Sequence, residues 1–365
     1  MSAPSDTREI EWERSPLVEP KRDAEVERWA RQAGALKAYP LHYYSACPWL
    51  ARSMARLGTI DLTHLDHDLA GRAVLVVSRD NSCRYCLAAA RLLLRAVGRS
   101  EESIESLEGD LASAEQAPER HPDLTFVRRL SRSNPPPTPA DIGALREAGF
   151  SREEILELAF VTAQYVAINR INTMVALPPE RFERLDRGWL LPLLRPAARR
   201  MFKARRRRHP PVFLSAGEKT GPFAAEVTGL DGLPAGRTLR QILDDAWSSP
   251  ILTRRTKALA FAVVARGLGA DRVEREALEL LAADGFERSA AESALAHLAS
   301  PALDPVESAL LPFVPETLWY EPAPLQRQVR QLRGKLSDAE LLEAVGIAAF
   351  ANAVCRLSLA LEAIE

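Results

Sequence analysis

The segment from Glu153 to Val175, EEILELAFVTAQYVAINRINTMV, decides the fold class of this chain. Apolar residues recur along it at three- and four-residue spacing, without the apolar–polar alternation of a half-buried strand. The segment from Ala339 to Ala363, AELLEAVGIAAFANAVCRLSLALEA, has the same pattern. Alanine, leucine, arginine and glutamate dominate the rest of the sequence, and aromatic residues make up only 6%. These features predict an all-α fold.

Signals for helix starts recur along the chain. Thr63 and Ser100 each precede acidic residues, and Ser151 and Ser337 are each followed three residues later by a glutamate. Such spacing is typical of N-caps and capping boxes. The proline-rich run at 134–139, NPPPTP, predicts a stiff connector between two helices.

The chain also matches itself at an offset of 187 residues (263 − 76). The offset aligns the following pairs: VVSR at 76–79 with VVAR at 263–266, Gly98 with Gly285, and LTFV at 124–127 with LPFV at 311–314. Farther on the offset becomes 186, which pairs EILE at 154–157 with ELLE at 340–343 and Arg170 with Arg356. Several matches at nearly one offset indicate an internal repeat.

We therefore expect two homologous helical domains. The predicted organisation is an N-terminal extension at 1–40, a first repeat at 41–177, a basic connector at 178–245 and a second repeat at 246–365.

The motif NSCRYC at 81–86 contains the most plausible reaction centre. Residues three apart share one face of a helix, so the thiols of Cys83 and Cys86 can close into a disulfide or share a metal. Asn81 or Ser82 is expected to be the N-cap, and the positive end of the helix dipole favours a thiolate. In the second repeat Ala270 and Val273 fall at the cysteine positions, so packing does not require the thiols.

Composition narrows the class of protein. The net charge of −1 over 365 residues gives no general attraction to nucleic acid, and the first residues have no apolar stretch typical of a secretory signal. Charges interrupt the apolar segments, so we expect no membrane span and a cytoplasmic location. In a reducing compartment a close cysteine pair indicates catalysis or metal binding, whereas Cys47 and Cys355 are expected in the core.

The stretch RAVLVVSRDNSCRYC at 72–86 resembles the AhpD-like alkylhydroperoxidases and carboxymuconolactone decarboxylases. The resemblance covers most of the first repeat and extends weakly to the second, which implies an AhpD-like helical bundle duplicated in tandem. It also implies a peroxidase in which Cys86 attacks a small hydroperoxide and Cys83 resolves the sulfenic acid to a disulfide. A dithiol or protein reductant would restore the thiols, and the family implies a homo-oligomer.

Two positions depart from the family pattern. Ala90 stands where the family has a histidine, and Gly71 stands where it has a glutamate. We therefore expect Arg79, Arg84 and Tyr85 to support the thiolate by charge or hydrogen bonding. Two other functions stay open: a decarboxylase-like lyase, and a noncatalytic scaffold or redox sensor.

Other polar clusters have simpler interpretations. His64, Asp66, His67 and Asp68 fit a helix start better than a metal site, and structural zinc usually needs four ligands. No glycine-rich nucleotide fingerprint is present, so we expect no cofactor and no metal.

Three further groups are candidates for pocket or surface roles. The segment HYY at 42–44 is expected to be a packed entry segment, and the polar residues NRIN at 169–172 a structural hydrogen-bond network. The basic run at 195–208 could contact an anionic membrane or nucleic acid, but a solvated helix is the favoured interpretation.

Overall fold

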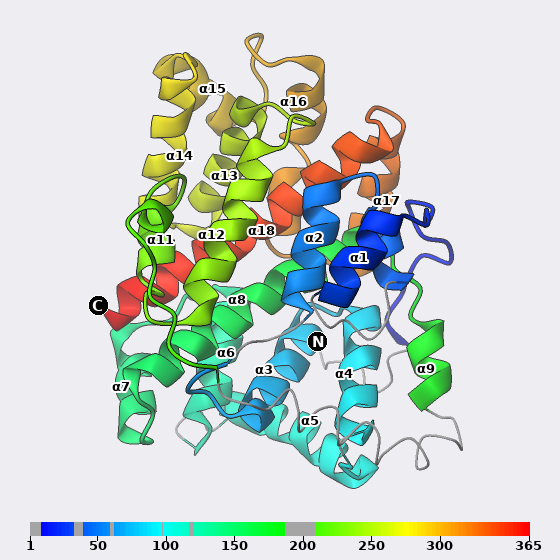
Figure 1. Cartoon of the computed structure of the whole chain (residues 1–365), viewed down its shortest axis with the longest axis vertical. Helices are drawn as coiled ribbons and strands as arrows, with labels where there is room; N and C mark the ends of the chain where they lie inside the picture. The colour runs from blue at the N-terminus through cyan, green and yellow to red at the C-terminus, as the bar shows by residue number, and fades with distance from the viewer. Residues whose placement is uncertain (1–8, 33–38, 59–61, 97, 117–119, 187–208) are drawn as a thin grey trace.

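The computed structural model describes residues 9–32, 39–58, 62–96, 98–116, 120–186 and 209–365 (Figure 1). Within these ranges the chain forms α-helices and short 3₁₀ helices (labelled η) and no strand, apart from one isolated bridge between Val212 and Gly232. The all-α prediction is confirmed.

The helices of the first half are α1 (Ala24–Gln32), η2 (Tyr39–Tyr44), α2 (Pro48–Leu57), α3 (His67–Asp80), α4 (Arg84–Ala96), α5 (Glu101–Gln116), α6 (Pro122–Arg132), α7 (Pro139–Glu147), α8 (Arg152–Met174) and α9 (Glu180–Asp186). Those of the second half are η4 (Gly217–Lys219), α11 (Ala224–Thr228), α12 (Pro234–Ser248), α13 (Arg254–Leu268), α14 (Asp271–Ala283), α15 (Arg288–His297), α16 (Pro305–Leu310), η5 (Val314–Thr317), α17 (Pro322–Arg333) and α18 (Asp338–Ile364).

The two long helices α8 and α18 pack against each other in the middle of the molecule, and the other helices surround them (Figure 1). Nearly every residue after the first turn of each is buried. Both begin with the predicted capping box: the Glu154 amide donates to Ser151 Oγ at 3.2 Å, and the Glu340 amide donates to Ser337 Oγ at 3.3 Å. These helix starts are confirmed.

The start of α3 differs from the prediction at Thr63. Asp66 is the N-cap, because its carboxylate accepts the amide of Asp68 at 2.7 Å. The amide of Thr63 instead donates to the carboxylate of Glu157 in α8, at 2.7 Å. The amides of residues 64 and 65 donate to the same buried carboxylate, so the segment before α3 is held against α8. The predicted cap at Ser100 is confirmed by its hydrogen bond from the Ser103 amide at 3.1 Å.

Two buried arginines join the halves of the chain. Arg170 of α8 donates to the carbonyl oxygens of Thr317 and Leu318, both at 2.8 Å. Arg356 of α18 donates to the carbonyl oxygens of Ser131, at 2.9 Å, and Leu318, at 3.2 Å. Burial lowers the pKa of Arg170 to about 10. Each arginine therefore holds backbone from the opposite half.

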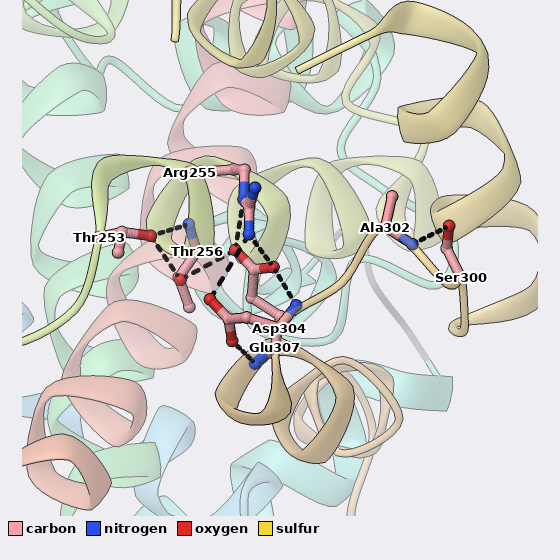
Figure 2. A network of polar contacts seen from close by, with 7 residues as sticks. All are labelled: Thr253, Arg255, Thr256, Ser300, Ala302, Asp304 and Glu307. Atoms are coloured by element: carbon pink, nitrogen blue, oxygen red, sulfur yellow. Dashed lines mark hydrogen bonds and ion pairs between the residues drawn. The ribbon is translucent and has the colours of Figure 1, made fainter. Parts of the chain in front are cut away.

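A second polar network fixes the start of α13 against α16 (Figure 2). Arg255 donates to both carboxylate oxygens of Glu307, at 2.8 and 2.7 Å, and Glu307 is fully buried. Asp304 caps α16 by accepting the Glu307 amide at 2.8 Å. A paired, hydrogen-bonded carboxylate of this kind is a structural feature of the fold.

The helix α18 is more apolar than the sequence prediction allowed. By length and composition alone it could cross a membrane, but its apolar window is 100% buried inside the protein. It is therefore a core helix in this structure.

Within the segment predicted as a connector, α9, η4, α11 and most of α12 are helical. The basic run at 195–208 lies outside the described residues.

Candidate active site

The turn between α3 and α4 positions Cys83 and Cys86. Asn81 ends α3, and its side-chain amide donates back to the carbonyl of Val77 at 2.8 Å. Ser82 has a left-handed backbone with φ of 48°. The residue directly before α4 is Cys83, whose Sγ accepts the amide N–H of Cys86 at 3.4 Å. The prediction of Asn81 or Ser82 as the N-cap is therefore wrong, because Cys83 occupies that position.

The sulfur atoms of Cys83 and Cys86 lie 2.7 Å apart, and both cysteines are free thiols. Cys83 is 0% exposed and Cys86 is 5% exposed. Burial raises the pKa of the Cys86 thiol, the hydrogen bond and charge of Cys83 raise it further, and a hydrogen bond from Asn172 lowers it. The expectation of a lowered pKa at Cys86 is not met, because desolvation outweighs the helix N-terminus.

Two of the three residues expected to support a thiolate, Arg84 and Tyr85, contact α9. The guanidinium of Arg84 forms a two-bond ion pair with Glu183 of α9, at 2.8 and 3.0 Å. The ring of Tyr85 packs edge-on against Phe182, with centroids 5.0 Å apart. Burial raises the pKa of Tyr85, and charges on the cysteines raise it further, so its phenol keeps its proton. Arg79 is half-buried in the last turn of α3.

A hydrogen-bond chain reaches Cys86 from the other side. The Nδ2 of Asn172 donates to Cys86 Sγ at 3.2 Å, and the hydroxyl of Tyr44 donates to Asn172 Oδ1 at 2.5 Å. Burial raises the pKa of Tyr44, so the hydroxyl stays a donor. For Tyr44 the favoured expectation was a packed entry segment and for Asn172 a structural hydrogen-bond network, with a pocket role as the alternative for both. The signal in the sequence was a polar residue on an otherwise apolar helix.

Two further residues of α8 share the face of Asn172. Burial raises the pKa of Tyr165 to about 12, and the charge that Cys86 carries as a thiolate raises it further. Asn169 is 0% exposed, and neither atom of its amide has a hydrogen-bond partner. Arg170, by contrast, has the structural role that was predicted for it.

The remaining candidates lie elsewhere. Cys47 and Cys355 are both 0% exposed, which confirms them as core cysteines. In the described part of the chain, no group of three or more metal-ligating side chains comes together. The chain matches no protein-family model, and no curated protein or solved structure is significantly similar to it.

Proposed function

We propose that the chain is a thiol-dependent hydroperoxidase that cycles Cys83 and Cys86 between dithiol and disulfide. One observation carries the proposal: the two sulfurs lie 2.7 Å apart at the start of α4, and Asn172 donates a hydrogen bond to one of them. Thiols at this separation can form a bond with little movement of either side chain. Cys86 is the more exposed of the two residues, at 5% against 0%, so we assign the attack on the substrate to it.

In the proposed cycle the Cys86 thiolate attacks the terminal oxygen of R–O–O–H. The O–O bond breaks, an S–O bond forms and the alcohol R–OH leaves, with Cys83 as the nearest proton donor. Cys83 then attacks the sulfenic sulfur of Cys86, an S–S bond forms and water leaves. In total two thiols and one hydroperoxide give one disulfide, one alcohol and one water. An external dithiol returns two electrons by thiol–disulfide exchange.

The environment of the thiols sets the expected rate and substrate size. Because burial raises the pKa of Cys86, only a small fraction is thiolate at neutral pH, and turnover is slow. Cysteine residues that are 0% and 5% exposed suit a small hydroperoxide and a small dithiol reductant, as well as small disulfides as alternative substrates.

The same proposal includes an AhpD-like tandem repeat. The helices α4 and α14 each have 13 residues and begin 187 positions apart (271 − 84), and α8 and α18 begin 186 positions apart (338 − 152). These are the offsets of the sequence matches, which supports two equivalent halves of which only the first carries the thiols. A cytoplasmic location and a homo-oligomer belong to the proposal as well.

Peroxide consumption tests the function. The purified chain is mixed with hydrogen peroxide and excess dithiothreitol, beside Cys86→Ser, Cys83→Ser and the control variant Cys47→Ser. We expect wild type and Cys47→Ser to consume peroxide catalytically and the other two variants to lose turnover. Equal consumption by wild type and Cys86→Ser, at the rate of dithiothreitol alone, refutes the enzyme.

The burial of both thiols favours one second candidate, a redox sensor. A sensor would form the disulfide once per chain and change its conformation without turnover. The same assay separates the two functions: a sensor holds a buried disulfide that small dithiols do not reduce, so it consumes one equivalent of peroxide, whereas an enzyme is reduced again and consumes many.

A further inference from the structure

Asn169 differs from the other buried asparagines that the structure describes. Asn81, Asn172 and Asn352 each have hydrogen-bonded side-chain amides, whereas both Oδ1 and Nδ2 of Asn169 are without a partner at 0% exposure. A buried polar group left unpaired destabilises the fold. The unpaired donor and acceptor of this amide therefore suit a small molecule that has both a hydrogen-bond acceptor and a donor.

The amide is on the side of α8 that faces the dithiol. Asn169 follows Tyr165 by four residues and precedes Asn172 by three, so the three side chains share one helix face. Asn172 donates to Cys86 Sγ at 3.2 Å. Asn169 lies about one helical turn before Asn172, on the same face.

The second half of the chain shows that packing does not require an amide here. At the offset of 186, Cys355 of α18 stands at the position of Asn169, and it is fully buried. At the offset of 187, Ala270 and Val273 stand at the positions of the two thiols and are also fully buried. The amide and the thiols are thus present together in one half and absent together from the other.

We propose that Asn169 is a substrate-binding residue that recognises the –O–O–H group of a hydroperoxide. Nδ2 donates to a peroxide oxygen, and Oδ1 accepts the peroxide O–H. A dialkyl peroxide has no O–H to offer, so it leaves Oδ1 unpaired and is discriminated against. This inference rests on the proposed function of the dithiol.

The test is single-turnover oxidation of the reduced full-length chain, followed by loss of free thiols. Wild type and Asn169→Leu, which is close in volume but apolar, are each treated with hydrogen peroxide, tert-butyl hydroperoxide and diamide. Diamide oxidises a dithiol without a peroxide group, so it is the control oxidant. Asn169→Ser is the second variant if leucine does not fit.

We expect the variant to react about tenfold more slowly with both hydroperoxides, and within about twofold of wild type with diamide. Its urea midpoint should be unchanged or higher, because no protein hydrogen bond is lost. Wild-type rates with both hydroperoxides would mean that Asn169 binds only water, and equal slowing with diamide would mean a general effect on the thiols. Either result overturns this inference alone. A wild-type dithiol that diamide oxidises but neither hydroperoxide does overturns the proposed function, and this inference with it.

Discussion

Replacing Asn172 with leucine removes two buried hydrogen bonds that have different consequences. The bond from Nδ2 to Cys86 Sγ is the interaction that lowers the pKa of Cys86. A hydrogen bond to a charged group contributes about 1.5 kcal/mol or more, so its loss should slow the reaction with hydrogen peroxide at least about tenfold. The bond from Tyr44 is lost too, and its buried hydroxyl is left unpaired at a cost of about 1–3 kcal/mol of stability.

The double variant Tyr44→Phe/Asn172→Leu separates these effects, because it also removes the orphaned hydroxyl. We expect urea unfolding to show that the double variant regains stability relative to Asn172→Leu, while quenched-flow alkylation shows that its thiols stay slow. Our reasoning about Asn172 is refuted if the single variant reacts within about twofold of wild type. It is also refuted if reactivity returns together with stability in the double variant, because the slow rate would then reflect misfolding.

Three other predictions concern stability. Burial raises the pKa of the thiols of Cys47, Cys86 and Cys355. Above about pH 8.5 the unfolded chain therefore loses protons that the folded chain keeps. The urea concentration at the unfolding midpoint should decrease as the pH rises from about 7.5 to about 10, and an equal midpoint at both pH values contradicts this prediction. Arg356→Met leaves the Ser131 carbonyl without its donor and should destabilise the chain by about 2 kcal/mol or more. A loss of stability below about 0.5 kcal/mol in urea unfolding would contradict the role of Arg356 in joining the two halves of the chain. Ser151→Ala removes an N-cap and should cost about 1 kcal/mol in the same assay, with exposed Ser289→Ala of α15 for comparison. Equal midpoints for these two variants would count against the capping box.

The features that could be predicted from sequence are local. The capping boxes at Ser151 and Ser337 depend on residues three positions apart, and the apolar spacing of α8 and α18 is visible within a single window. The close approach of Cys83 and Cys86 follows in the same way from one helical turn.

The features that were missed depend on partners distant in the chain. Thr63 was predicted to be an N-cap, but its amide donates to Glu157, 94 residues away. Arg84 was expected near a thiolate, but Glu183, 99 residues away, pairs with it. Tyr44 donates to an asparagine 128 residues away. The raised pKa of Cys86 also depends on burial by several helices, which the motif alone does not reveal.

The most direct test of the dithiol cycle is intact-protein mass spectrometry before and after one equivalent of hydrogen peroxide, followed by peptide mapping without reduction. We predict a loss of two hydrogens per chain and a peptide that contains a disulfide between Cys83 and Cys86. An unchanged mass, with both thiols still open to alkylation after denaturation, would contradict the account.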